Sequence, residues 1–234
     1  MAADRPVALV TGAGSGIGRE IALVLAAMNH RLVLVGRREE PLRETSSLLS
    51  VSDAVVIPGD VGDAAFAEAL VGRVLEAAGR LDVLVNNAAI APSVPIVGTS
   101  AALLDEAFRI DAIGPGLLIA RAWPVFVRQR SGCVVNISTM GTADPFPGFF
   151  AYAAAKSALE SMTRSCAVEG RRLGIRAFAV APGAVETRML RRLFDERVIP
   201  RDRCLSPQRV AEVVAACVRG DHDDRNGQTI RVTP

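Results

Sequence analysis

The chain has 234 residues, of which 50% are hydrophobic and 22% charged, and its basic and acidic side chains leave a net charge of +2. This composition is that of an ordinary globular protein, and the length suits one α/β domain that buries about 70–75% of its unfolded surface. The small net charge gives no electrostatic reason to expect a nucleic acid or a membrane surface as partner. No apolar stretch reads as long enough to cross a bilayer, so we expect no membrane span.

Seven short runs rich in apolar and β-branched residues alternate with longer segments of helical spacing. In chain order the runs occupy residues 7–10, 32–35, 54–57, 83–85, 133–137, 175–180 and 229–232. Helical spacing occupies residues 16–28, 64–78 and 151–169, and a further helix is expected to begin near Pro207. Short buried strands joined by helical crossovers are typical of parallel sheets covered on both faces. We therefore predict a doubly wound, Rossmann-like α/β fold of three layers, in a single domain over residues 1–234.

The cysteines and histidines give no sign of disulfides or of a metal site. The four cysteines are far apart and form no C-x-x-C pair: Cys133, Cys166, Cys204 and Cys217. A strand-like run already begins at Val7, so we expect no signal peptide, reduced thiols and a cytoplasmic location. His30 and His222 are at opposite ends of the sequence, so we expect no bound metal.

A glycine-rich turn follows the first strand and opens the first helix. Residues 11–18 read TGAGSGIG, with glycines at positions 12, 14, 16 and 18. Glycines let the backbone approach a pyrophosphate closely, and a helix N-terminus supplies free N–H groups and partial positive charge. A plain tight turn is the alternative, but it requires fewer glycines. The turn therefore predicts a phosphate-binding site.

The end of the second strand bears on the choice of dinucleotide. An acidic residue there would bond the adenosine ribose, whereas arginine accommodates a 2′-phosphate. The chain has Arg37 and Arg38 at this place, with no carboxylate before Glu39. The alternative is that both are solvated side chains of an arginine-rich chain. The pattern favours NADP(H) over NAD(H), because guanidinium groups suit a phosphate.

Tyr152 is the only tyrosine of the chain, and Lys156, four residues later, is its only lysine. On a helix these side chains lie on one face, one turn apart. A nearby ammonium group favours the phenolate and would lower the pKa of the phenol by about 1–3. An incidental helix pair is the alternative for so short a pattern. The upstream glycine turn favours the interpretation as a proton-transferring pair.

Taken in order, six motifs make the chain resemble the single-domain branch of the short-chain dehydrogenase/reductase family over nearly its whole length. They are TGAGSGIG at 11–18, Asp60-Val61, NNAA at 86–89, NIST at 136–139, YAAAK at 152–156 and PGAVET at 182–187. By this resemblance, Tyr152 would be the general acid in carbonyl reduction and the base in alcohol oxidation. Lys156 would hold the nicotinamide ribose.

The resemblance and the residue patterns together predict the cofactor-binding set. It comprises Thr11, Gly12, Gly14, Ser15, Gly16, Ile17, Gly18, Arg37, Arg38, Asp60, Val61, Asn86, Asn87, Ala88, Tyr152, Lys156, Pro182, Gly183, Val185 and Thr187. Within it, the resemblance implies that Asp60 contacts the adenine amino group and that Val185 and Thr187 hold the carboxamide.

Two catalytic positions depart from the family pattern. Thr139 stands where the family usually has a serine that polarises the substrate carbonyl, and Ser138 just before it is our second choice. Asp111 stands where the family often has a catalytic asparagine. Its charge would favour the ammonium form of Lys156, and it could disturb the proton relay. We expect activity to survive. A smaller departure is Ala89, where glycine is usual.

The substrate is encoded only weakly. The resemblance implies a substrate lid around residues 187–205, and residues 188–203 hold six arginines against three acids. That excess, with Arg130, Arg171 and Arg172, suits an anionic acyl-CoA or acyl-carrier thioester as an alternative to a small ketone or secondary alcohol. Phe146, Phe149 and Phe150 could form an apolar lip. The resemblance also implies a homodimer or homotetramer, formed through helices near residues 101–128 and 151–170. A non-catalytic dinucleotide sensor or partner subunit is the alternative from another class.

Overall fold

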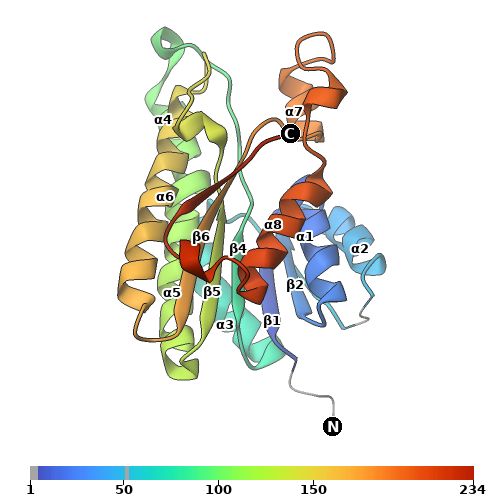
Figure 1. Cartoon of the computed structure of the whole chain (residues 1–234), viewed down its shortest axis with the longest axis vertical. Coiled ribbons are helices and arrows are strands. Elements are labelled where there is room, and N and C mark those ends of the chain that lie inside the picture. Colours follow the sequence, from blue (N-terminus) through green and yellow to red (C-terminus); the bar gives the residue numbers. More distant parts are fainter. Residues whose placement is uncertain (1–4, 51–52) are drawn as a thin grey trace.

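The computed structural model describes residues 5–50 and 53–234, and its centre is a sheet of seven parallel strands (Figure 1). The strand order is β3-β2-β1-β4-β5-β6-β7. The strands are β1 Val7–Thr11, β2 Arg31–Gly36, β3 Val55–Pro58, β4 Val83–Asn86, β5 Gly132–Ile137, β6 Ile175–Pro182 and β7 Thr229–Val232. Each of the seven apolar runs in the sequence overlaps one of these strands, and the predicted doubly wound fold is confirmed.

Helices cover both faces of the sheet (Figure 1). One hydrophobic core joins the sheet to α1 (Gly16–Ala27), α2 (Glu39–Ser47) and α8 (Pro207–Arg219). A second core joins the opposite face to α3 (Ala64–Ala78), α5 (Gly114–Gln129) and α6 (Phe150–Gly170). The central strands β1 and β4 are buried along their whole length. Burial on both faces explains why these strands read as continuous apolar runs instead of alternating ones.

The strand order reverses between β1 and β4: the chain adds β2 and β3 on one side of β1, and then β4 on its other side. At such a switch point the loops beyond the strands diverge to opposite faces and leave a crevice, where doubly wound proteins bind their ligands. The glycine turn follows β1, and the NNAA segment begins at the last residue of β4. The topology therefore brings these two motifs to the same edge of the sheet.

The helix α4 (Ala101–Phe108) continues into α5 through a π-helical turn, Arg109–Ile113. By length and composition, the run Ala101–Gln129 would suffice to cross a membrane, contrary to our expectation from the sequence. Its apolar side chains pack in the fold, since Leu118 and Phe126 belong to the core shared with α3 and the sheet. Core helices of globular proteins commonly reach this apolarity.

The segment after β6 stands above the edge of the sheet (Figure 1). It contains α7 (Arg188–Leu193) and a short 3₁₀ turn, Arg201–Arg203. A parallel bridge between Val185 and Leu205 joins its two ends, with the Leu205 N–H donating to the Ala184 carbonyl at 2.8 Å. This segment, residues 187–205, corresponds to the predicted lid.

Candidate active site

A cavity of about 1000 Å³ opens at the carboxyl ends of the strands. The loops after β1 to β6 contribute to its walls, together with α6 and the lid. Most of the predicted site residues line it. Thr11, Asn86 and Asp111 do not, and each acts from behind the cavity wall.

The glycine turn is packed too closely to admit side chains. Gly12 has a φ of +66°, and a Cβ there would lie 2.7 Å from the Asn87 Nδ2. A Cβ on Gly18 would lie 2.3 Å from the Gly12 carbonyl oxygen. The first glycine is thus required by backbone conformation, and the last by close approach.

Thr11 and Asn87 fix this turn against the loop that follows β4. The Asn87 Nδ2 donates to the Thr11 carbonyl at 2.9 Å, and the backbone N–H groups of Asn87 and Ala88 donate to the Thr11 Oγ1 at 3.0 and 3.1 Å. The Thr11 hydroxyl in turn donates to the Val85 carbonyl at 3.3 Å. Asn86 points elsewhere and donates to the Asn136 Oδ1 at 2.9 Å. Thr11 and Asn86 therefore shape the cavity without facing it.

These features fit a dinucleotide. The N-cap residue Ser15 makes no side-chain cap on α1, so the first N–H groups of that helix are left for a ligand, and helix N-termini of this kind bind phosphate. Arg37 and Arg38 follow β2 as exposed side chains on the cavity wall. Asp60 lies beside them in the wall and accepts from the Gly62 N–H at 2.9 Å.

Tyr152 and Lys156 occupy one face of α6, as the spacing predicts. The Lys156 Nζ lies 5.9 Å from the centre of the Tyr152 ring and donates to the Ile137 carbonyl at 2.8 Å. Lys156 is 1% exposed, and burial lowers the pKa of its ammonium group, which the Asp111 carboxylate opposes.

The pKa of Tyr152 moves in the opposite direction from the one we expected. Desolvation in the cavity wall raises the pKa of the phenol, and the Asp111 carboxylate raises it further. A hydrogen bond with the Thr139 side chain opposes both. The expected lowering by Lys156 was wrong for this structure, because desolvation of the phenol and, after it, the Asp111 carboxylate set the direction of the shift. The phenol is held in its protonated form.

The two neighbouring hydroxyl groups of the NIST motif are used differently. The Ser138 hydroxyl donates to the Glu160 Oε1 at 2.5 Å, and this carboxylate oxygen also accepts from the Thr142 hydroxyl at 2.9 Å. The Thr139 Oγ1 accepts from the Gly141 N–H at 3.2 Å and bonds to Tyr152. Thr139 is therefore the residue placed beside the phenol, and Ser138, our second choice, is engaged by Glu160. Sequence reasoning missed Glu160, which lies one helical turn beyond Lys156.

Asp111 lies in the π-helical turn and is completely buried. Its Oδ1 accepts from the Ile90 N–H at 3.0 Å, and its Oδ2 has no hydrogen-bond partner among the described residues. Burial raises the pKa of Asp111 to about 6, although Lys156 and the Ile90 N–H both lower it. The carboxyl group acts on Tyr152 and Lys156 through its charge, from behind the cavity wall.

Beyond Tyr152 the cavity is apolar. The Phe149 ring lies 6.1 Å from the Tyr152 ring, edge to face, and 6.0 Å from the Phe194 ring of the lid. Further walls come from Met140, Phe146, Leu193, Val198 and Ile199. Phe146 and Phe149 thus belong to the predicted apolar lip, whereas the exposed Phe150 does not line the cavity.

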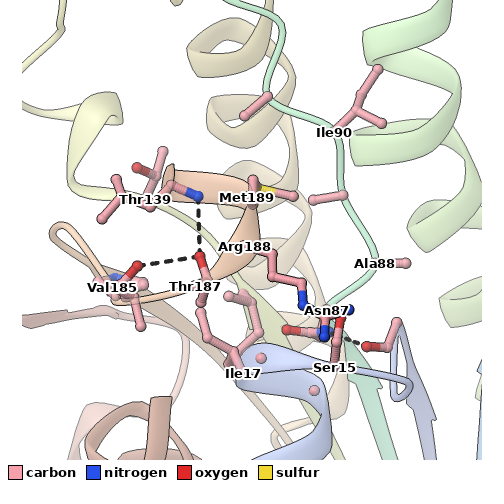
Figure 2. A pocket seen from close by; sticks show the side chains of 18 of the residues that line it. Ser15, Ile17, Asn87, Ala88, Ile90, Thr139, Val185, Thr187, Arg188 and Met189 are labelled. Atoms are coloured by element: carbon pink, nitrogen blue, oxygen red, sulfur yellow. Dashed lines mark hydrogen bonds between the residues drawn. The ribbon is translucent and has the colours of Figure 1, made fainter. Parts of the chain in front are cut away.

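Three of the six arginines of residues 188–203 are held in ion pairs. Arg191 pairs with Glu186, Arg197 with Asp195 at 3.0 Å, and Arg201 with Glu196 at 2.7 Å. Asp195 and Glu196 are among the acids of the same segment, and only Glu186 lies outside it. Arg188 is different, since it lines the cavity and its side chain extends towards Ser15 and Asn87 (Figure 2). Sequence reasoning also missed this residue.

The match with a known protein family agrees with this geometry. A family model described as short chain dehydrogenase matches residues 6–198. The chain belongs to the short-chain dehydrogenase family. This membership confirms the resemblance read from the six motifs, and it makes the chain an oxidoreductase that binds a nicotinamide dinucleotide.

Several relatives of this short-chain dehydrogenase have more specific names. Levodione reductase from Leifsonia aquatica is 38% identical over 189 residues, covering 79% of this chain and 71% of that protein. The crystal structure of a variant of actinorhodin polyketide ketoreductase with NADPH is 30% identical, with a TM-score of 0.92 over 100% of this chain and 98% of the other. A 3-ketoacyl-(acyl-carrier-protein) reductase from Brucella melitensis, complexed with NADH, is 27% identical, with a TM-score of 0.91 over 97% and 96%. Both coenzymes therefore occur among its structural neighbours.

Proposed function

We propose that this short-chain dehydrogenase transfers hydride reversibly between NADP(H) and an apolar ketone or the corresponding secondary alcohol. The observation that carries the proposal is the meeting of two sets of residues in one cavity. The glycine turn and the two arginines after β2 line one end. Tyr152, Lys156 and Thr139 line the other.

The coenzyme would supply the hydride, and the side chains of the chain would handle the proton. A substrate carbonyl oxygen between Tyr152 and Thr139 would accept hydrogen bonds from both hydroxyl groups. The raised pKa of Tyr152 keeps the phenol protonated, which is the form that donates a proton as negative charge develops on that oxygen. In alcohol oxidation the same residue, as phenolate, would take the proton of the alcohol.

Lys156 would hold the ribose and stabilise charge near the phenol. Its ammonium group is fixed by the Ile137 carbonyl, with the Asp111 carboxyl group behind the wall as a counter-charge. A compact ammonium group can make several hydrogen bonds at once in a confined space, which a guanidinium group cannot do equally well. That requirement explains why an arginine-rich chain has a lysine here.

The preference for NADP(H) rests on Arg37 and Arg38. Both line the cavity, both are exposed, and neither forms an ion pair with another described residue. A 2′-phosphate on the adenosine ribose would provide the missing negative charge. Arg37→Ala should therefore weaken NADPH binding about tenfold or more and leave NADH binding nearly unchanged.

The apolar wall supports an apolar carbonyl substrate. Phe149, Phe194 and Val198 offer ring and aliphatic surface beside Tyr152. The acyl-thioester alternative relied on the arginine excess of the lid, and three of those arginines, Arg191, Arg197 and Arg201, are engaged in ion pairs with acidic side chains of the same region. The apolar wall is therefore the stronger guide to the substrate.

The test is to titrate the protein with NADPH and NADH and then assay a panel of apolar ketones, aldehydes and β-keto thioesters. We expect tighter binding of NADPH and coenzyme oxidation with at least one apolar ketone. Tighter binding of NADH would overturn the coenzyme preference. Coenzyme binding without turnover of any carbonyl compound would favour the sensor or partner-subunit alternative.

A further inference from the structure

Arg188 is a cation in the cavity wall that the fold itself does not use. It is the first residue of α7, it is exposed, and it lines the cavity. Across residues 5–50 and 53–234, no ion pair or hydrogen bond engages its side chain. Its neighbour Arg191, by contrast, is held by Glu186 and donates to the Ile199 carbonyl at 2.8 Å.

The stability of α7 does not explain this arginine. A positive side chain in the first turn opposes the helix dipole, and acidic residues are the ones that stabilise this position. The first turn of α7 contains no acidic residue, and its cap comes from Thr187, whose Oγ1 accepts from the Leu190 N–H at 3.2 Å. The helix dipole therefore does not favour a cation at position 188. We look for the role of this side chain in the cavity that it lines.

The side chain of Arg188 is directed at the glycine turn. Figure 2 shows it extending from the start of the lid towards Ser15 and Asn87, and all three residues line the same cavity. The lid begins close to this turn, because a Cβ on Gly16 would lie only 3.3 Å from the Thr187 Cγ2. Arg188 and the N-terminus of α1 thus line the same cavity.

We infer that Arg188 binds the pyrophosphate of the dinucleotide from the lid side. The inference rests on the proposed function, because it needs a dinucleotide in this cavity. The first N–H groups of α1, a helix of 12 residues, would hold the phosphates from below. A planar guanidinium group forms paired, charge-assisted hydrogen bonds to phosphate oxygens and keeps its charge under all working conditions. Arg188 thereby ties the lid to the coenzyme.

This assignment has a signature that differs from that of the arginines after β2. The pyrophosphate is common to NADPH and NADH, whereas the 2′-phosphate occurs only in NADPH. Loss of Arg188 should therefore weaken both coenzymes by the same factor, and loss of Arg37 should weaken NADPH alone. One charge-assisted hydrogen bond at an exposed site corresponds to about a tenfold change in the dissociation constant.

The experiment measures the equilibrium binding of NADPH and of NADH to the wild-type protein, Arg188→Gln, Arg192→Gln and Arg37→Gln. Arg192 is the matched control, since it is an exposed arginine of the same helix that does not line the cavity. We expect Arg188→Gln to weaken both coenzymes about tenfold and Arg192→Gln to change neither. Unchanged melting temperatures would show that the variants are folded. Arg188→Lys, which keeps the charge but loses the paired hydrogen bonds, should recover part of the affinity.

Three results would overturn the inference. Arg188→Gln could bind both coenzymes as the wild type does. It could lose NADPH alone, which would assign Arg188 to the 2′-phosphate. It could also keep both affinities while the KM of an anionic ketone rises, which would assign it to the substrate. Failure of the proposed function is distinguishable from all three, because the wild-type protein would then bind neither coenzyme or turn over no carbonyl compound.

Discussion

The two ends of the cavity differ in how their polar groups are satisfied. At the glycine turn, the Thr11 hydroxyl and the Asn87 amide bond to backbone groups, and the Cβ positions of Gly12 and Gly18 are already occupied by neighbouring atoms. Behind Tyr152, the Asp111 Oδ2 is buried without a partner among the described residues, and the Lys156 amine is buried as well. The glycine-turn end is defined by close packing, whereas the Tyr152 end contains a buried carboxyl group that is only partly hydrogen-bonded.

This difference separates what the fold needs from what the chemistry needs. Buried charges destabilise a protein unless they are paired and fully hydrogen-bonded. Asp111 meets that condition only in part, so stability does not explain its presence. Charge that is costly to the fold, placed beside the only tyrosine, indicates a part in proton transfer.

The largest expected effect comes from removing the phenol at the charged end. Tyr152→Phe should lower kcat by about 10²–10⁴-fold, because a positioned general acid contributes a factor of that size. Coenzyme affinity should hardly change, since the glycine turn and the arginines remain. Steady-state kinetics and a coenzyme titration measure the two effects separately. Unchanged turnover would refute the role of Tyr152.

The next effect is the pH dependence that Asp111 gives to stability. Burial raises its pKa from 3.8 to about 6, so between these values the folded chain binds a proton that the unfolded chain has already released. The contribution of Asp111 to the free energy of unfolding is therefore most favourable below pH 3.8. It falls by about 3 kcal/mol in all as the pH rises from 3.8 to about 6.

Comparison with Asp111→Asn isolates this term, because other carboxyl groups titrate alike in both proteins. The free energy of unfolding of the variant minus that of the wild type should grow as the pH rises from about 4 to about 6. Denaturant unfolding at several pH values measures it, and parallel curves would contradict the assignment. The variant should also shift the pH profile of alcohol oxidation to lower pH, since Asp111 raises the pKa of Tyr152.

A smaller effect tests the tightly packed end. Gly18→Ala should lower stability by about 1–3 kcal/mol or more, because its Cβ would meet the Gly12 carbonyl oxygen and cannot be accommodated by a side-chain movement. Gly72→Ala is the matched control, in α3 with no atom within 4 Å of the new Cβ. It should raise stability by about 0.5–1 kcal/mol. Thermal or denaturant unfolding measures both, and equal effects would show that packing at the turn is looser than described.

The smallest effect separates the two hydroxyl groups of the NIST motif. Ser138→Ala should lower stability by about 1 kcal/mol through loss of its hydrogen bond to Glu160 and leave turnover nearly unchanged. Thr139→Ala should lower turnover with little loss of stability. Unfolding and kcat measured on both variants decide the matter. The reverse result would make Ser138 the residue that polarises the carbonyl.

The parts predicted well from the sequence are those encoded by local patterns. Strands β1, β2, β4, β5 and β6 are largely buried and appear as continuous apolar runs. The edge strands β3 and β7 are only partly buried, and they were found because they still contain apolar, β-branched residues. The glycine turn and the Tyr152–Lys156 pair are also local, since spacing along one turn or one helix places their atoms. These features depend little on the rest of the chain.

The parts predicted poorly depend on neighbours distant in sequence or on charge in three dimensions. The direction of the Tyr152 pKa depends on burial in the folded chain and, after that, on Asp111, which is 41 positions away in the sequence. Glu160 engages Ser138 from a helix 22 residues later. The direction of the Arg188 side chain follows from the contact between the lid and the glycine turn. This contact joins segments far apart in the sequence, so the spacing of residues does not predict it.

The single lysine of the chain has a practical consequence. Lys156 is 1% exposed, bound to the Ile137 carbonyl and part of the cavity wall, so amine-directed reagents can reach it through the cavity. Apart from the terminal amine, an acylated amine would report on access to the catalytic centre. The rate of its modification would thus measure that access without an engineered probe, and a coenzyme that fills the cavity should slow it.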